Sequence, residues 1–474
     1  MAPIAYHSRS RHAASRRPAW SPRRHARPHQ PRSQAGAPPL AAPVPADAWP
    51  SLTAALEQVI DLEASARAHG ALCRRRCLRT AADLLRLCLS YAVGDLSLRL
   101  AGQWATLAGV GTLSDVAVLQ RLRRARPWLA ALVAALLLAS TPDGAGRPLA
   151  SRTGRRAVLR LVDGTVLMAP GSGGVAWRGH ATLDLATLRL ADVELTDQHG
   201  GESLARHPWQ PGEVAIGDRG FCRTGGLRTV LQAGADVVVR LLPSSVRLET
   251  EEVGARLDLV AWLATGPTTS LRERPVWLVS PHERHPLRLL AGALPPVQAD
   301  AARRTLRQQA RRHGRTPSHA SLVTAGWVLL LTSLPQDAWP AADLLVLYRC
   351  RWQVELLFKR LKSLWRLDGL RARDPDLAQS YLLAKFLAIL LTEHALAPAQ
   401  PMLDAWTIDP EHPLSLWRWT QTCVTLVTAA ILGPRTLPEL LDAVPRLRRF
   451  LCSPPRRRPC QSAVAPRLAT HRAA

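Results

Sequence analysis

The spacing of apolar residues divides the chain into helical and strand-rich parts. Between Pro50 and Ser140 apolar residues recur every three to four positions, which is typical of helices that bury one face. Over residues 156–242 short apolar runs bounded by Gly and Asp predict strands, and β-like runs continue through residues 243–335. Helical spacing returns over residues 336–450. The pattern predicts an α/β protein whose strand-rich part lies between two helical parts.

The first helical part contains a helix, a turn and a basic helix in succession. Residues 97–108 are predicted to be helical, residues 109–113 form a Gly-containing turn, and Ser114 is a suitable N-cap for the next helix. That helix is basic, with Arg121 and Arg124 among its arginines. This order is found in helix-turn-helix DNA-binding units, but a structural hairpin with Arg on its solvent-exposed face has the same pattern. Both interpretations remain open.

The basic helix is expected to end at Arg126, and the apolar run 128–139 predicts a separate, buried helix. This run is the longest apolar one in the chain, and it is too short to cross a bilayer of about 30 Å. We therefore expect no membrane partner.

The strand-rich part is predicted to form a mixed α/β sheet. Its elements are strands at 157–162, 213–217 and 236–242, a hairpin at 183–195 and a helix at 226–233. Two acids, Asp163 and Asp218, each follow a predicted strand and precede a tight turn. The insertion 243–335 is expected to be largely β, with a basic helical segment at 301–312.

Residues 348–362 are predicted to form the helix on which a site is mounted. At about 100° per residue, four polar side chains fall within an arc of roughly 60°: Tyr348, Arg351, Glu355 and Lys362. An adjacent arc is apolar and is expected to pack inward: Leu347, Val354, Phe358, Leu361 and Trp365. A helix face that lines up polar groups beside a buried stripe is typical of a functional site on a rigid element.

Charge points to a polyanionic partner. The 474 residues carry a net charge of +26, with a pI of about 11.3, and such an excess favours nucleic acid. The N-terminal tail is rich in Arg and Pro, and its only acid is Asp47. We expect it, like the basic C-terminal tail, to be disordered.

Three acids are candidate ligands of divalent metal ions. Asp163 and Asp218 on neighbouring strands, with Glu355 on a packing helix, could hold two ions that drive in-line displacement at phosphorus. Mg²⁺ suits such an all-oxygen site, and Mn²⁺ can replace it. Each acid alone has a structural explanation, since Asp-Gly is a common turn and Glu355 could pair with Lys359 on the surface. The conjunction of all three on a very basic chain favours a catalytic site.

The chain also resembles the DDE transposases of bacterial insertion sequences. Their Tyr-x2-Arg-x3-Glu-x6-Lys signature is present with every spacing kept, from Tyr348 to Lys362. The sequences VDGT at Asp163 and GDRGF at Asp218 match the settings of the family's first two acids. The resemblance covers roughly residues 75–400.

The resemblance implies an RNase H-like catalytic domain with a β-rich insertion, preceded by an all-helical domain. It implies Mg²⁺-dependent cleavage at terminal inverted repeats of double-stranded DNA, strand transfer to target DNA by cut-and-paste, and a homodimer in the synaptic complex. Asp163, Asp218 and Glu355 would bind the metal ions, while Tyr348, Arg351 and Lys362 would contact phosphates near the cleaved end. Trp327 stands where relatives have a Trp that stacks on a flipped base, although a core Trp is an equally plain interpretation.

The expected division of the chain is a disordered Arg- and Pro-rich tail (1–48), a helical DNA-binding domain (49–145), the first part of the RNase H-like core (156–242), the insertion (243–335), the second part of the core (336–400), a C-terminal helical region (401–450) and a disordered basic tail (451–474). We expect a bacterial, cytoplasmic, nucleoid-associated protein. Two other hypotheses stay open at this point. One is a catalytically decayed, transposase-derived DNA-binding protein, and the other is an RNase H-like DNA nuclease that does not join strands.

Overall fold

The computed structural model describes residues 48–73, 77–140, 148–172, 174–265, 271–281, 283–409 and 411–433. The predicted tails therefore lie outside the described residues, apart from Ala48, and so does the end of the predicted C-terminal helical region. These described residues belong to one compact unit. The domain boundaries within it stay predictions.

The N-terminal helices begin where the sequence supplies caps. They are α1 (Trp49–Glu57), α2 (Leu62–Ala68), α3 (Ala81–Val93), α4 (Leu98–Leu107) and α5 (Asp115–Ala139). Thr80 and Asp83 form a capping box on α3, and the Ser97 and Ser114 side chains accept hydrogen bonds at the starts of α4 and α5. The predicted N-caps at Ser97 and Ser114 are thus present.

The predicted end of a helix at Arg126 is wrong, because α5 continues through Pro127 to Ala139. Proline removes one backbone hydrogen bond from a helix interior. Burial of the following apolar face outweighs that loss here: Trp128, Leu129, Leu132, Val133 and Leu136 are at most 4% exposed.

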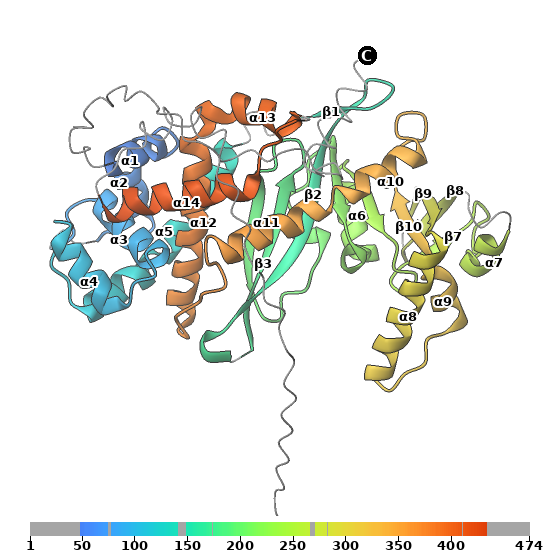
Figure 1. Cartoon of the computed structure of the whole chain (residues 1–474), viewed down its shortest axis with the longest axis horizontal. Coiled ribbons are helices and arrows are strands. Elements are labelled where there is room, and N and C mark those ends of the chain that lie inside the picture. The colour runs from blue at the N-terminus through green and yellow to red at the C-terminus, as the bar shows by residue number, and fades with distance from the viewer. Residues whose placement is uncertain are drawn as a thin grey trace, which may run out of the picture. The chain divides into compact units, whose positions relative to one another are not determined.

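A ten-stranded sheet forms the centre of the described structure (Figure 1). Its strands are β1 (Leu149–Ala150), β2 (Arg156–Met168), β3 (Val175–Asp184), β4 (Leu190–Asp197), β5 (Glu213–Gly217), β6 (Asp236–Arg240), β7 (Arg247–Glu249), β8 (Arg272–Val279), β9 (Arg284–Ala293) and β10 (Trp327–Thr332). The order across the sheet is β4-β3-β2-β5-β6-β10-β9-β8-β7, with β1 paired to β2.

Strand directions divide the sheet into a mixed half and an antiparallel half. β2, β3 and β4 form an antiparallel meander, while β5 pairs parallel to β2 and β6 pairs parallel to β5. The parallel crossover between β5 and β6 contains α6 (Thr224–Gln232). From β6 onward the pairing is antiparallel through β10, β9, β8 and β7.

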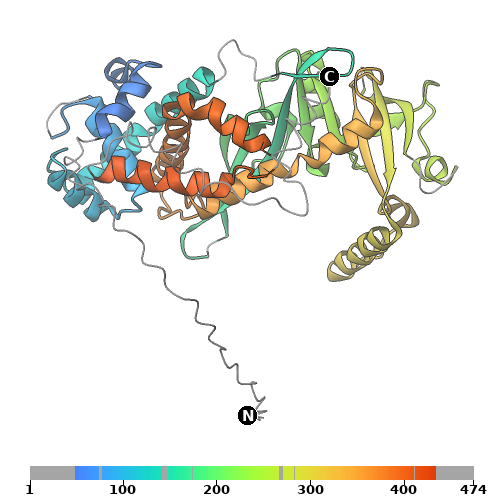
Figure 2. The same cartoon turned by 45° about the horizontal axis from the view of Figure 1, so that its top comes forward.

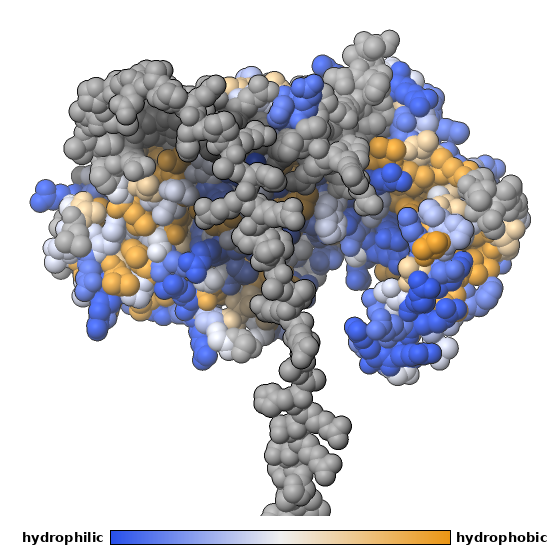
Figure 3. All heavy atoms as spheres, in the orientation of Figure 1, coloured by the Kyte–Doolittle hydropathy of each residue, from blue (hydrophilic) through white to orange (hydrophobic). Residues whose placement is uncertain are grey.

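The predicted insertion extends the same sheet, because β10 pairs with both β6 and β9. Its helices are α7 (Leu259–Ala264), α8 (Pro296–Arg312) and α9 (His319–Thr324). Only Ala299 of α8 is buried, and hydrophilic residues cover this helix in the space-filling view (Figure 3). Arg304, Arg307, Arg311 and Arg312 are exposed on it, so the insertion presents a strongly basic surface.

The chain ends, within the described residues, in helices that pack on both the sheet and the N-terminal helices. They are α10 (Ala341–Arg349), α11 (Trp352–Ser363), α12 (Pro375–Ala395), α13 (Gln400–Ile408) and α14 (Leu416–Leu432). α12 is almost entirely buried and contacts α1, α3 and α5, while α11 contacts β2 (Figure 2). This packing joins the N-terminal helices to the helices that cover the sheet.

The described residues also contain four short 3₁₀ turns: η2 (Pro170–Ser172), η3 (Leu204–Arg206), η4 (Arg219–Phe221) and η5 (Ala397–Ala399). Among the described residues, no single helix has the length and apolar composition to cross a membrane. One bent pair, Pro375–Ala395 with Ala397–Thr407, meets the test on length and composition only.

Candidate active site

Asp163 lies in the middle of β2, so the predicted end of the strand at this residue is wrong. The ladder to β3 continues across it, with Asp163 paired to Ala181 and Gly164 paired to His180. Asp-Gly favours a turn locally, but the long partner strand β3 holds it extended. The Asp163 Oδ1 atom accepts a hydrogen bond of 2.8 Å from the Gly164 amide.

Asp218 follows β5, as predicted, and lies beside Asp163. β5 runs parallel to β2 with Leu161 registered against Ile216, and each acid stands two residues further along its strand. Side chains two residues apart point to the same face, and neighbouring strands lie about 4.8 Å apart. The Asp218 side chain accepts a hydrogen bond of 2.7 Å from the Gly220 amide and caps η4. The two acids therefore share one face of the sheet.

The helix predicted over residues 348–362 is two helices with a tight break between them. α10 ends at Arg349 and α11 begins at Trp352. The amides of Arg351, Gln353 and Val354 donate to carbonyls three residues back, so the chain tightens locally without a Gly or Pro. The predicted apolar stripe is nevertheless buried: Leu347, Val354, Phe358, Leu361 and Trp365 are all at most 6% exposed.

Arg351 connects the signature helix to the sheet. Its Nη2 atom donates a hydrogen bond to Oε1 of Glu355, and its Nη1 atom lies 3.8 Å from Oδ2 of Asp163. One guanidinium therefore lies between two of the three predicted metal ligands. Burial raises the pKa of the Tyr348 phenol, against the effect of the Arg351 charge, so Tyr348 belongs to the same cluster.

Lys362 fixes the far end of α11 to the sheet. Its Nζ atom donates a hydrogen bond of 2.8 Å to the carbonyl of Val166, three residues beyond Asp163 on β2. Partial burial lowers the pKa of the ammonium. Lys362 therefore positions the helix in this conformation.

The carboxyl of Asp163 is poorly solvated. Burial is the main reason that its pKa rises to about 7, and the charges of Asp218 and Glu202 raise it further. The Gly164 amide and Arg351 oppose this shift. A carboxyl that costs free energy to ionise gains most from a nearby cation.

The donor set fits a hard divalent cation, since the side chains that converge here are carboxylates. In this conformation, however, the described residues contain no group of three or more His, Cys, Asp or Glu side chains placed to hold one metal ion. The Arg351 guanidinium lies between the carboxylates of Asp163 and Glu355. It supplies positive charge to both carboxylates.

A further acid, Glu202, was missed by the reasoning from sequence. An ideal Cβ on Gly164 would lie 3.0 Å from the Glu202 Oε1 atom, and one on Gly220 would lie 2.5 Å from its Oε2 atom. Its carboxylate thus lies against the glycines that follow Asp163 and Asp218. A glycine shortly after each of two candidate acids is the one sequence signal that could have indicated a third group between them.

The remaining predicted DNA-binding residues lie on β10 and α5. Trp327 opens β10, is 6% exposed, and has the Arg272 guanidinium 4.8 Å from its ring centre. It could stack on a base only after Arg272 left that face. On α5, Arg124 is exposed and Arg121 is half-buried, while Arg123 and Arg126 pair with Asp374 and Asp376 at the start of α12.

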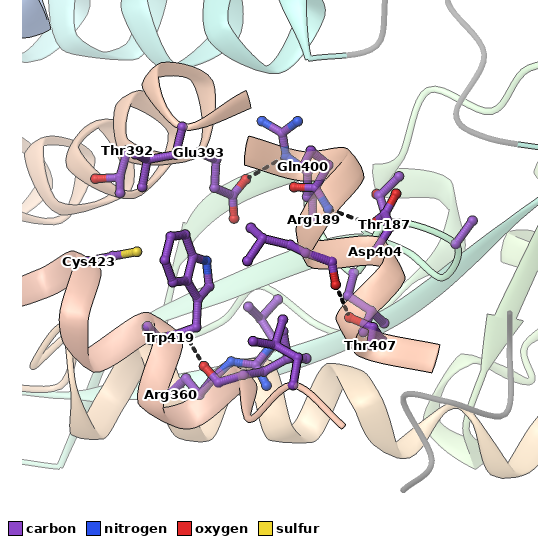
Figure 4. A pocket seen from close by; sticks show the side chains of 18 of the residues that line it. Thr187, Arg189, Arg360, Thr392, Glu393, Gln400, Asp404, Thr407, Trp419 and Cys423 are labelled. Carbon is purple, nitrogen blue, oxygen red and sulfur yellow. Dashed lines mark hydrogen bonds and ion pairs between the residues drawn. The ribbon is translucent and has the colours of Figure 1, made fainter. Parts of the chain in front are cut away.

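A cavity of about 630 Å³ lies elsewhere on α11 and is lined also by α12, α13 and α14 (Figure 4). Arg360 and Trp419 line it, and Arg189 and Glu393 form an ion pair of 3.6 Å in its wall. None of the three predicted catalytic acids borders it. This cavity is therefore separate from the predicted catalytic acids.

The chain is similar to a transposase family and to transposases of known insertion sequences. Residues 154–391 match the transposase DDE domain family. The chain is 41% identical over 364 residues to InsL of insertion sequence element IS186A from Escherichia coli (strain K12), covering 76% of this chain and 95% of the relative. It is also 41% identical over 365 residues, with the same coverage, to the transposase for insertion sequence element IS421 of Escherichia coli.

More distant matches follow. The transposase for insertion sequence element IS231F of Bacillus thuringiensis subsp. israelensis is 23% identical over 279 residues, which is 52% of this chain and 58% of the relative. A solved piggyBac transposase synaptic complex with hairpin DNA covers 86% of both chains at 10% identity with a TM-score of 0.40, which is too low to carry an argument. The family match and the 41% identity over nearly the whole length of its relatives show that this chain belongs to the DDE transposases of bacterial insertion sequences.

Proposed function

We propose that this protein is a DNA transposase that cuts the terminal inverted repeats of its insertion sequence and joins the freed ends to target DNA. The observation that carries the proposal is the placement of Asp163 and Asp218 at matching positions of paired parallel strands, with Glu355 linked to Asp163 through Arg351. Membership of the transposase DDE domain family supports it independently.

The strand order supports an RNase H-like core. β4-β3-β2-β5-β6 combines a three-stranded antiparallel meander with two parallel strands added beside its first strand. This is the arrangement expected of that fold. In it the first acid lies on the first strand and the second acid follows the fourth, as Asp163 and Asp218 do.

The DDE domain implies dependence on a divalent metal ion, and we propose Mg²⁺, which Mn²⁺ can replace. Asp163, Asp218 and Glu355 would hold the ions, which supply Lewis-acid activation of the attacking oxygen and stabilise the leaving oxygen. Arg351 must then leave Glu355, and its freed guanidinium can pair with a DNA phosphate. Tyr348 and Lys362 flank the same acids and are proposed to contact the phosphates near the cut.

The chemistry consists of two displacements at phosphorus. In the first, the oxygen of water attacks a phosphodiester, the bond to the 3′ oxygen breaks, and a 5′ phosphate and a 3′-hydroxyl result. The water proton passes to solvent, and the leaving 3′ oxygen takes up a proton. In the second, the 3′-hydroxyl oxygen attacks a target phosphodiester and displaces the target's own 3′ oxygen, so no net bond energy has to be supplied.

The DNA-binding surface is proposed to combine the α4–α5 unit with Arg121 and Arg124, the signature residues, and Trp327 in the insertion. A net charge of +26 and the exposed arginines of α8 supply long-range attraction to DNA. We also propose that the protein acts as a homodimer, so that two transposon ends are held together.

A cleavage and joining assay on duplex DNA that carries the element's terminal repeats tests the proposal. The wild-type chain should cut the ends and join them to a target only with Mg²⁺ or Mn²⁺, and Asp218→Asn should abolish both while DNA binding survives. Asp197→Asn, at the exposed end of β4, is the matched control and should keep activity.

The outcomes separate the competing functions. Binding without cleavage would indicate a decayed DNA-binding protein, and cleavage without joined products would indicate a nuclease. Cleavage by Asp218→Asn at the wild-type rate would show that the assigned acids do not carry the reaction.

A further inference from the structure

Glu202 lies on a loop whose main chain is fixed on both sides. The loop joins β4 to β5, and Leu204, two residues further on, is fully buried. The Arg206 side chain donates a 2.7 Å hydrogen bond to the Gly201 carbonyl and pairs with Glu194 on β4 at 3.1 Å. These contacts hold the backbone at Glu202 close to the paired strands that carry the acids.

The Glu202 carboxylate fills space that two glycines leave open. On Gly164, an added Cβ would lie 3.0 Å from Oε1 and 3.1 Å from Cγ of Glu202. On Gly220, it would lie 2.5 Å from Oε2, which is closer than real Cβ contacts. Neither glycine has a positive φ, so the backbone itself does not require glycine at these positions. The shared reason is the carboxylate between them.

The same position brings Glu202 close to Asp218. The Cβ position on Gly220 lies 2.5 Å from Glu202 Oε2 and 3.2 Å from Asp218 Oδ1, so these oxygens are at most 5.7 Å apart, the sum of the two distances. Glu202 has no hydrogen bond or ion pair with another residue in the described part of the chain. Burial and the Asp218 charge raise the pKa of Glu202, while the charges of Arg178 and Arg223 offset part of this effect, and a bound cation would offset more of it.

We propose that Glu202 is a fourth carboxylate of the catalytic centre, which Gly164 and Gly220 admit and which helps to hold the divalent ion beside Asp163 and Asp218. This inference rests on the proposed function, because the divalent ion follows from the DDE assignment. It adds that an acid outside the three-residue motif contributes to ion affinity. Gly164 of the VDG sequence and Gly220 of the GDRG sequence thereby leave the space that the Glu202 carboxylate occupies.

Direct binding of Mn²⁺ to the full-length, DNA-free protein, measured by electron paramagnetic resonance, tests the inference. Glu202→Gln keeps the shape but removes the charge, and it should weaken Mn²⁺ binding about 10- to 100-fold, as loss of a supporting carboxylate does in other metal sites. Its midpoint of thermal unfolding in EDTA should be unchanged or higher, because one repelling charge is gone. Glu194→Gln, on β4 and paired with Arg206, is the matched control and should bind Mn²⁺ as wild type does.

A double-mutant cycle tests whether a side chain at position 220 displaces the Glu202 carboxylate. Gly220→Ala should push the Glu202 carboxylate away and weaken Mn²⁺ binding as Glu202→Gln does, but it should have no further effect in a Glu202→Ala background. Gly225→Ala, where nothing lies within 4 Å, should bind Mn²⁺ normally. The concentration of Mn²⁺ that half-saturates end cleavage should rise for the variants that bind Mn²⁺ more weakly and stay at the wild-type value for the two controls.

Two results would overturn the inference: Mn²⁺ binding by Glu202→Gln within twofold of wild type, or an equal effect of Gly220→Ala with and without Glu202. Asp218→Asn separates this failure from failure of the proposed function. If Asp218→Asn loses Mn²⁺ and cleavage while Glu202→Gln loses neither, only the role of Glu202 is wrong. If Asp218→Asn keeps both, the catalytic assignment itself fails.

Discussion

Replacing Arg351 by Gln should tighten divalent-ion binding while it weakens catalysis. In the structure the guanidinium donates a hydrogen bond to Glu355 and lies 3.8 Å from Asp163. An incoming cation must displace it from both carboxylates, so part of the ion's binding free energy is lost to breaking these pairs. The variant removes that competition.

The magnitude follows from the geometry. At an effective dielectric constant of about 20, two unit charges 3.8 Å apart attract by about 4 kcal/mol. Much of this is cancelled by desolvation and by solvent, since the Asp163 and Glu355 side chains are 16% and 31% exposed. The net competition from Arg351 is about 1–2 kcal/mol, so its removal should tighten ion binding roughly 5- to 30-fold.

The assay is Mn²⁺ binding to DNA-free Arg351→Gln, measured beside end cleavage at saturating Mn²⁺. We expect the dissociation constant to fall about 5- to 30-fold and the cleavage rate to drop at least tenfold, because the phosphate contact is lost. Arg349→Gln, an exposed arginine two residues away on α10, should leave ion affinity unchanged. Weaker Mn²⁺ binding by Arg351→Gln would refute the view that the Arg351 guanidinium competes with a bound cation.

The other predictions concern stability, pH and salt. Arg160→Met should lower the free energy of unfolding in urea by about 3–5 kcal/mol, because it leaves the buried Asp184 and Glu213 carboxylates without their shared partner. A loss below about 1 kcal/mol would contradict this prediction. Burial and, to a smaller extent, the Arg206 charge lower the pKa of His180 from 6.5 to about 4. Between these pH values the unfolded chain binds more protons than the folded one, so the free energy of unfolding falls as pH falls. It should fall by about 2 kcal/mol from pH 7 to pH 5, and by correspondingly less in His180→Asn. DNA affinity should fall steeply with salt, by about 0.9 log units per phosphate contact for each tenfold rise, and a flat response would show that the arginines do not carry affinity.

The sequence pattern predicted well wherever local rules decide the structure. Ser97 and Ser114 cap helices because their side chains satisfy amides a few residues away. The apolar stripe of α11 is buried because helical spacing puts its members on one side. Family membership could be inferred from the spacing of the signature alone, and the comparisons confirm it.

Contacts between distant parts of the chain account for what was not predicted. Asp163-Gly164 stays extended because β3 pairs across it, and β10 joins the insertion to β6 over about ninety residues of sequence. The helix break at Cys350 and Arg351 contains no Gly or Pro that would predict it from the sequence. Glu202 approaches Asp218 only through the packing of its loop on the sheet, which no spacing rule encodes.

Anomalous diffraction from crystals of this protein grown with Mn²⁺ and a terminal-repeat DNA end tests the central claim most directly. We predict an anomalous peak between Asp163 and Asp218, with Glu355 turned toward the metal and Arg351 moved from Glu355 to a DNA phosphate. Manganese bound elsewhere, with the Arg351 and Glu355 pair intact beside the DNA, would contradict the assignment of these acids as the catalytic centre.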